Sequence, residues 1–433
     1  MPSNIQATVA PGKMTSPRPS LYQFGNTFYC LVYEQGGVAL NLNPVVMQSL
    51  DDGATWNQLG DTSFANYATT KVMNAVFAVD SIGTPHLVYG QYAGTGTVFN
   101  IYHSKYIAGA WTTPVLIKAL TVLKYPTAIF DQGYIMASLI PHNTGLALAV
   151  FGKIDFHNFG VGFKTTGLWA FEFDGTNWDA GTQLRTGAGL ADPYDDQRDP
   201  FLAADSADNL HLIFAGPPAG STNRAGIKIR YRKKITTTWG TEEEAYPTAF
   251  HAVTSPPYFS DLKIDLTDLP HFALVLPPTN TELLHVYKTA SWASETVVID
   301  PLVIWDAGLL LPHIPGTPSL PYYQALLFTR SGPTTGTHYR TLDLQMEDPP
   351  STNPNSAMIF YWATWNNNPG GGNMMYVYKV DGISFGSPIT YTLVPKQAWI
   401  GQHSFSCYIV ETPKPPRSLQ GVQSIQGIHS LTF

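Results

Sequence analysis

Ser49-Leu-Asp-Asp-Gly-Ala-Thr-Trp56 is the stretch that decides the fold of this 433-residue chain. It fits the pattern Ser-x-Asp-x-Gly-x-Thr-Trp. A short carboxylate such as Asp51 accepts hydrogen bonds from backbone N–H groups one and two residues on, which closes a turn. Gly53 supplies the backbone freedom of that turn, and the Trp56 ring covers it as the next strand begins. We therefore predict a strand–turn–strand unit whose structural residues are Ser49, Asp51, Gly53, Thr55 and Trp56.

The composition predicts an all-β protein. The chain has 37 Gly, 34 Pro and 13% aromatic residues, with many Thr between apolar runs. Charged residues make up 13%, against about 25% in an average soluble domain. This composition is typical of a rigid extracellular or virion-type protein, and the net charge of −7 argues against a nucleic-acid partner.

One short pattern recurs three times along the chain. A strand ends at Asp, a turn follows, and a new strand opens with His six residues later. The pattern occurs in Asp80–His86, Asp205–His211 and Asp265–His271. The intervals fit a repeat of roughly 60 residues with one divergent copy, and each occurrence reads as a hairpin. Because equivalent positions in different repeats lie far apart, we expect each His to hydrogen-bond its own turn and not to share a metal.

A second recurring element closes each repeat: a strand, a polar turn and an aromatic residue. Trp56, Trp111, Trp178, Trp239 and Trp292 hold the aromatic position, and degraded copies follow at 339–344 and 376–385. Units of four short strands at this period predict a β-propeller. We predict seven blades, with six or eight as alternatives.

The turn pattern resembles the Asp-box (BNR) turn of sialidase-like β-propellers, which implies a propeller whose Asp-box turns sit on the rim. Pro17-Arg18-Pro19 looks like a shortened form of the first sialidase motif, and by that resemblance Arg18 would bind a substrate carboxylate. The family also needs a further Arg and an Asp before the first Asp-box. Residues 31–48 contain neither, so we predict no catalytic residues.

The densest charged segment is Asp192-Pro-Tyr-Asp-Asp-Gln-Arg-Asp199. Loops at this place in a propeller border the funnel where ligands bind. Carboxylates here would suit Ca²⁺, sugar hydroxyls or acid–base hydrolysis of a glycoside, and the alternative is a solvated loop. The candidate ligand residues are Asp192, Tyr194, Asp195, Asp196, Arg198 and Asp199.

A second candidate is the aromatic loop around Trp362 and Trp365, which runs into Asn-Asn-Asn-Pro-Gly-Gly-Gly. Such loops suit sugar or protein recognition, and the alternative is a Gly-rich turn with core tryptophans. We expect no metal centre and no cofactor, apart from the possible Ca²⁺ at the acidic loop.

The domain organisation follows from these patterns. We predict an N-terminal arm at 1–19, a propeller at 20–410 and a Pro-rich linker with a docking arm at 411–433. We expect both arms to dock on other subunits, and the alternative is docking on the propeller itself. A terminal strand at 404–410 would complete a blade begun at the other chain end, bringing Cys407 near Cys30 on strand 27–34. The alternative is two unrelated buried thiols.

These observations favour a non-catalytic propeller that serves as a structural or receptor-binding component of a larger particle, such as a phage virion or tail. The chain has no apolar run of 18 residues and no signal-peptide pattern. The alternative is a glycan-binding or sialidase-like glycan-hydrolysing propeller. In that case the chemistry would be glycoside hydrolysis.

Overall fold

A computed structural model gives the structure of this protein. It describes residues 4–8, 13–15, 21–24, 27–35, 42–50, 57–62, 71–92, 98–121, 131–156, 163–186, 198–216, 227–250, 258–259, 262–265, 267–276, 282–299, 304–310, 323–330, 344–346, 356–364, 374–381, 384–385, 389–392 and 403–411.

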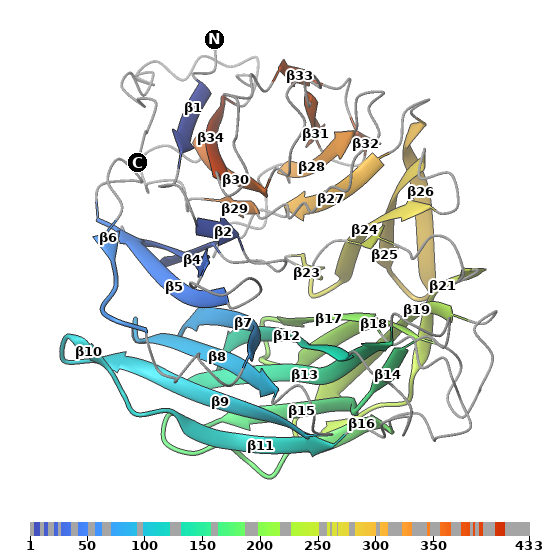
Figure 1. The fold of residues 1–433 in the computed structure, drawn as a ribbon. Helices are drawn as coiled ribbons and strands as arrows, with labels where there is room; N and C mark the ends of the chain where they lie inside the picture. The colour runs from blue at the N-terminus through green and yellow to red at the C-terminus, as the bar shows by residue number, and fades with distance from the viewer. Residues whose placement is uncertain are drawn as a thin grey trace. The chain divides into compact units, whose positions relative to one another are not determined.

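The fold is all-β, as the composition predicts, and of the β-propeller class, as the recurring strand units predict. The described strands form antiparallel sheets of four or five strands, most of them built from strands consecutive in the chain (Figure 1). The chain divides into two compact units, residues 1–34, 45–59 and 305–433, and residues 35–44 and 60–304. The prediction of seven blades stays a prediction.

Four sheets lie in the second unit. The first contains β7 (Lys71–Val79), β8 (Pro85–Tyr92), β9 (Val98–Ile107), β10 (Ala110–Trp111) and β11 (Val115–Thr121). The second contains β12 (Asp131–His142), β13 (Gly145–Phe156), β14 (Phe163–Thr165), β15 (Gly167–Phe173) and β16 (Thr182–Thr186). The third contains β17 (Arg198–Ala204), β18 (Leu210–Gly216), β19 (Ile227–Ile235), β20 (Thr238–Trp239) and β21 (Glu243–Phe250). The fourth contains β22 (Tyr258–Phe259), β23 (Lys263–Ile264), β24 (Pro270–Leu276), β25 (Glu282–Lys288) and β26 (Trp292–Ile299).

The first unit holds the strands from both ends of the chain. One sheet contains β2 (Lys13–Thr15), β3 (Leu21–Phe24), β4 (Thr27–Gln35), β5 (Leu42–Ser49) and β6 (Asn57–Gln58). Another contains β27 (Ile304–Leu310), β28 (Tyr323–Arg330), β31 (Met374–Asp381), β32 (Ser384–Phe385) and β33 (Ile389–Thr392). The last contains β1 (Asn4–Thr8), β29 (Leu344–Met346), β30 (Ser356–Thr364) and β34 (His403–Glu411). These last two sheets interleave, because β28 pairs with β31 and the chain between them supplies β29 and β30.

Strands from the two chain ends pair as predicted. The last strand, β34, lies between β1 and β30, with Cys407 opposite Ile5 on one side and Phe360 on the other. The strand from the N-terminal end is Asn4–Thr8, and not 27–34 as the sequence led us to expect. Cys30 lies on β4 opposite Leu21 in a different sheet, so the strand pairing does not bring the two cysteines opposite each other. Residues 412–433 lie outside the described part.

In the second unit the first strands of successive sheets lie next to one another: β12 packs against both β7 and β17. Their direction follows from two contacts. Lys234, beside the turn after β17, forms an ion pair with Glu172, near the hairpin after β12. Lys105, beside the turn after β7, donates to the Gly175 carbonyl at 3.3 Å, near the same hairpin. The hairpin turns therefore share one end of these sheets, and β7, β12 and β17 all begin at the opposite end, which we name the first-strand end.

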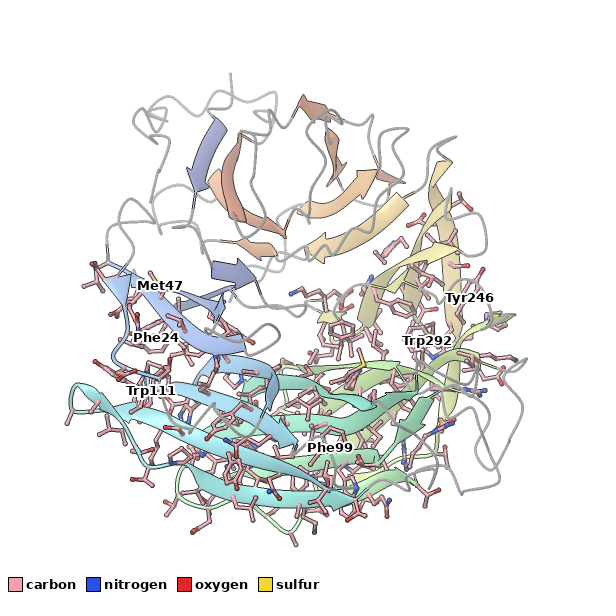
Figure 2. All side chains as sticks on the ribbon, in the orientation of Figure 1. Phe24, Met47, Phe99, Trp111, Tyr246 and Trp292 are labelled. Carbon is pink, nitrogen blue, oxygen red and sulfur yellow. The ribbon has the colours of Figure 1, made fainter. Side chains whose placement is uncertain are left out.

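Apolar side chains fill the space between these sheets (Figure 2). Phe151, Leu202, Leu212 and Phe214 belong to a buried cluster between the second and third sheets. A second cluster, with Ile213, Phe272 and Val286, joins the third and fourth. Packing is close enough to require glycine at 152, because a Cβ there would lie 2.5 Å from the Phe99 ring of the neighbouring sheet.

Candidate functional site

The segment that opened the sequence analysis lies between two paired strands. Met47 and Gln48 at the end of β5 pair with Gln58 and Asn57 of β6, the last strand of that sheet. Ser49 ends β5, and Asp51, Gly53, Thr55 and Trp56 lie outside the described residues.

The described tryptophans of the second recurring element occupy equivalent places, each following the hairpin after a third strand. Trp111 pairs back on β9, Trp178 on Phe173, Trp239 on β19 and Trp292 on β25. The turn Asp174-Gly-Thr-Asn-Trp178 shows how Asp works at this position. Asp174 Oδ1 accepts the N–H groups of Thr176 and Asn177, both at 2.7 Å, as an Asx turn requires.

The acidic segment leads directly into β17. Asp192, Tyr194, Asp195 and Asp196 lie outside the described residues, whereas Arg198 and Asp199 open the strand, with Arg198 opposite Ala215 of β18. The candidate ligand loop thus enters the sheet at the first-strand end.

The neighbouring sheet has two more acidic residues at the first-strand end. Asp131 is the first residue of β12, and Asp155 lies on β13 opposite Gln132. The first sheet adds Lys71 at the start of β7, opposite Tyr92. Sequence reasoning did not select Asp131 or Asp155 as ligand residues, because only the packing of β12 on β17 places them at the end where β17 begins. Carboxylates, cations and a tyrosine are the residue types that bind sugar hydroxyls and rings.

Described side chains near this end of the third sheet form an ionic network. Glu244 on β21 accepts from Lys228 at 2.7 Å and from Arg230 at 3.0 Å. The Arg230 Nε also donates to the Gly216 carbonyl at 3.3 Å. These pairs hold the outer strands of the sheet whose first strand carries Arg198 and Asp199.

A buried ion pair joins the second and third sheets. Arg185 on β16 donates to Glu242 through two nitrogens, Nε at 2.9 Å and Nη2 at 2.6 Å. Its guanidinium carbon lies 5.2 Å from the Phe214 ring centroid. Such a bidentate geometry fixes both partners and specifies how the sheets align. The basic run Lys228-Ile-Arg-Tyr-Arg-Lys-Lys234 lies on a neighbouring strand of the third sheet. Most of its charged side chains pair with acidic residues elsewhere in the chain.

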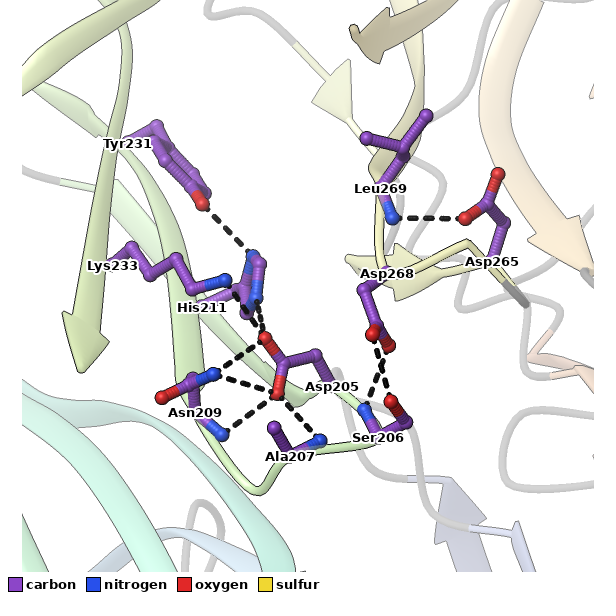
Figure 3. Close-up of polar contacts among 10 residues, drawn as sticks. All are labelled: Asp205, Ser206, Ala207, Asn209, His211, Tyr231, Lys233, Asp265, Asp268 and Leu269. Atoms are coloured by element: carbon purple, nitrogen blue, oxygen red, sulfur yellow. Dashed lines mark hydrogen bonds and ion pairs between the residues drawn. The ribbon is translucent and has the colours of Figure 1, made fainter. Parts of the chain in front are cut away.

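The three Asp–His repeats form equivalent hydrogen-bonded relays. Asp80, Asp205 and Asp265 each accept two turn N–H groups through Oδ1, at 2.7–3.1 Å. Their Oδ2 atoms lie 3.1–3.2 Å from the Nε2 of His86, His211 and His271. Figure 3 shows the second relay, in which Lys233 joins Asp205 at 2.8 Å.

Each histidine also meets a partner on the adjacent strand. His86 Nδ1 lies 2.9 Å from His103 Nε2, and His271 Nδ1 lies 2.9 Å from His285 Nε2. In the second relay the Tyr231 hydroxyl takes this place, 2.8 Å from His211 Nδ1 (Figure 3). The expectation that each histidine serves its own turn is confirmed, and the described residues contain no group of side chains that could hold a metal ion.

Burial sets the ionisation of these relays. It lowers the pKa of His86 and of His211, and it lowers the pKa of His103 to about 3. Burial also raises the pKa of Tyr231 well above its ordinary value. Burial has the opposite effect on Asp205, because it favours the neutral acid and so acts to raise the pKa. Hydrogen bonds from Lys233, Asn209 and His211 outweigh burial and hold the pKa below its usual range. The neutral form of His211 is therefore favoured, and it donates from Nε2 to the ionised Asp205 carboxylate.

The aromatic loop is only partly placed. Trp362 lies on β30 opposite Phe405 of β34, and Trp365 lies outside the described residues. The described residues also include no helix with the length and apolarity of a membrane span.

No protein-family model and no curated protein matches this chain. Among solved structures, it is similar to an α-L-arabinofuranosidase from Fusarium graminearum bound to an iminosugar inhibitor, at 11% identity over 94% of this chain and 97% of that chain, with a TM-score of 0.49. It is also similar to an α-L-arabinanase from Penicillium chrysogenum complexed with arabinobiose, at 14% identity over 76% and 94% of the two chains, with a TM-score of 0.46. A polysaccharide lyase aligns at 10% identity over 72% and 86%, with a TM-score of 0.39. At this level of likeness, the activity has to be argued from the residues of this chain.

Proposed function

We propose that this chain is a glycan-binding β-propeller whose ligand lies at the first-strand end of the second unit. One observation carries the proposal. Adjacent strands of neighbouring sheets place Asp131, Asp155, Arg198 and Asp199 at the same end, where the acidic loop enters. Carboxylates there accept hydrogen bonds from sugar hydroxyls, and charge-assisted bonds of this kind are about twice as strong as neutral ones.

Binding and cleavage make different demands on these carboxylates. Hydrolysis of a glycoside needs two of them at about 5 to 9.5 Å, one acting as acid and the other as base or nucleophile. Binding needs only acceptors. Residues 31–48 lack the further Arg and the Asp that the sialidase-like pattern places before the first Asp-box, so binding is the primary proposal and hydrolysis the additional one.

The test measures affinity for neutral and acidic oligosaccharides, arabinobiose among them, by titration calorimetry. We expect Asp131→Asn, Asp155→Asn and Asp199→Asn each to weaken binding about 10-fold or more, since each removes a charged acceptor. Asp208→Asn is the matched control, because Asp208 is an exposed carboxylate at the opposite end of the third sheet. Unchanged affinity in all three variants contradicts the proposal. Release of reducing ends by the wild type, lost in one variant that still binds, assigns hydrolysis.

We also propose, as a second function, that the chain serves as a subunit of a larger particle, such as a phage virion or tail. Its support is the sheet that joins both chain ends, because β34 of that sheet continues in the sequence into the Pro-rich linker and docking arm predicted at 411–433. Deleting residues 412–433 should abolish assembly in sedimentation velocity while the monomer stays folded. An unchanged assembly contradicts this role.

A further inference from the structure

The relay of the fourth sheet is longer than the other two. His271 Nε2 lies 3.2 Å from Asp265 Oδ2, and His271 Nδ1 lies 2.9 Å from His285 Nε2. The second histidine then continues to another carboxylate, because His285 Nδ1 lies 2.7 Å from Glu295 Oε1. The two imidazole rings stack with centroids 5.1 Å apart and 15° between their planes. Four side chains thus form a continuous chain of three contacts with a carboxylate at each end.

A count of protons distinguishes this four-residue relay from the other two. Each of the three contacts is a hydrogen bond only if one proton lies between its two atoms. Two neutral imidazoles carry one N–H each, and two ionised carboxylates carry none. The ordinary ionisation states therefore supply two protons for three contacts, and the relay lacks one proton. Without the third proton, a lone pair of one histidine faces another acceptor at hydrogen-bonding distance.

The other two relays are complete without an extra proton. Asp80, His86 and His103 make two contacts, for which two neutral histidines supply two protons. Asp205, His211 and Tyr231 also make two, which the imidazole N–H and the phenol O–H satisfy. The difference comes from a single residue, Glu295, which stands opposite His285 in the pairing of β25 with β26.

The groups around the two histidines determine which side chain moves when the proton binds. Burial lowers the pKa of His285, and the hydrogen bond and charge of Glu295 oppose that effect. Among the described residues, the other titratable groups around the pair are Tyr287, whose ring stacks on both histidines, and Lys263, which pairs across the strand with His271. The side chain of Glu295 is 42% exposed, so it is the one member of the chain that can turn to water.

We propose that the His271–His285 pair is a proton-binding switch: it takes up one proton on acidification, and the Glu295 carboxylate docks on His285 in the protonated form and turns to solvent in the neutral form. The proton completes the third hydrogen bond and leaves one positive charge between two carboxylates. Protonation therefore ties β26 to β25 at this point. The switch lies at the hairpin-turn end of its sheet, so it does not depend on the proposed glycan site.

The test is a titration of the full chain labelled with ¹⁵N-histidine, followed by imidazole NMR from pH 8 to pH 4. We expect the His271 and His285 nitrogens to move toward imidazolium shifts about one pH unit or more above any change at His86 and His103. This comparison needs no variant. Simultaneous titration of the two pairs, or neutral signals from His271 and His285 throughout, would overturn the proposal.

Two glutamine variants locate the cause. In Glu295→Gln the amide donates to His285 Nδ1 of the neutral pair, so the extra proton is no longer required and the titration should move down by about one pH unit or more. Glu243→Gln is the matched control, because the Glu243 side chain is also 42% exposed but contacts Lys288 and Trp292. A wild-type titration in Glu295→Gln, or the same shift in Glu243→Gln, contradicts the role of Glu295.

Discussion

Trp292 packs edge-on against Tyr231 of the neighbouring sheet, with ring centroids 5.1 Å apart and an interplanar angle of 72°. Trp178 stands in the same relation to His103, at 5.3 Å and 83°. In both cases a tryptophan that follows a third strand covers the last member of the relay in the preceding sheet. The two recurring elements of the sequence therefore act together. The Asp–His pair closes a turn within one sheet, and the tryptophan of the next sheet packs over the relay that this pair begins.

The two tryptophans differ in one contact, which predicts different responses to Trp→Phe. Trp292 Nε1 donates to Glu243 at 3.2 Å, whereas Trp178 Nε1 is buried and has no hydrogen-bond partner among the described residues. We expect Trp292→Phe to lower the free energy of unfolding by about 1 kcal/mol more than Trp178→Phe, because only the former loses a hydrogen bond. Urea denaturation of both variants measures this, and equal losses contradict it.

Acid should destabilise the protein through His103. The unfolded chain protonates this histidine near its ordinary pKa of 6.5, but burial lowers the pKa to about 3 in the folded chain. The unfolded state therefore binds more protons between these values, so stability is full above pH 6.5 and falls as the pH drops through the window. The slope from this residue approaches about 1.4 kcal/mol per pH unit. Urea midpoints at pH 4 to 7 should fall less steeply in His103→Gln, and an identical slope contradicts the assignment.

Asp208 and Asp268 offer a matched test of a contact between turns. Both adopt positive φ, 58° and 64°, at the same place in equivalent turns. Asp268 reaches across to the neighbouring sheet, accepting the Ser206 N–H at 2.8 Å and its hydroxyl at 2.7 Å (Figure 3), and Asp208 has no such contact with the described residues. Glycine removes the side chain and suits positive φ, so Asp208→Gly should be close to neutral and Asp268→Gly should destabilise by about 1 kcal/mol. Thermal unfolding compares them, and equal melting temperatures would count against the contact.

The buried Arg185–Glu242 pair should show strong coupling. Glu242→Ala leaves the Arg185 guanidinium buried without its carboxylate, which destabilises by about 3–5 kcal/mol. Replacing both partners, as Arg185→Met with Glu242→Leu, should restore part of that loss, because Arg230 also lies 3.7 Å from Glu242 and keeps Glu244. A double-mutant cycle on denaturant-derived free energies measures the coupling. Additive losses would show that the pair contributes nothing as a pair.

Local spacing explains what the sequence could predict. The six-residue step from Asp205 to His211 is fixed by one turn, so it recurs and predicts a hydrogen bond within that turn. The third member of each relay sits on the following strand, at separations of 17, 20 and 14 residues, because the hairpins of second and third strands differ in paired length and in loop length. No fixed spacing therefore marks His103, Tyr231 and His285 in the sequence.

The candidate site shows the same limit at longer range. Asp192 to Asp199 stand out because they are consecutive, whereas Asp131 and Asp155 are isolated acids that gain meaning only when β12 lies beside β17. The basic run at 228–234 is the converse case. Its alternation looks like a solvated strand face, but Arg230 is 5% exposed because Glu242 and Glu244 lie across from it.

The pairing of Ile5 with Cys407 has a consequence for the order of events during synthesis. The β1–β34 contact joins residues from opposite ends of the chain, and loop closure of that length is slow compared with hairpin formation. The hairpins of the second unit can form as they leave the ribosome, but β1 finds its partner only after the last strand has emerged. Until then β1 and β30 present unpaired edges. The nascent chain is therefore open to intermolecular strand exchange until β34 has emerged.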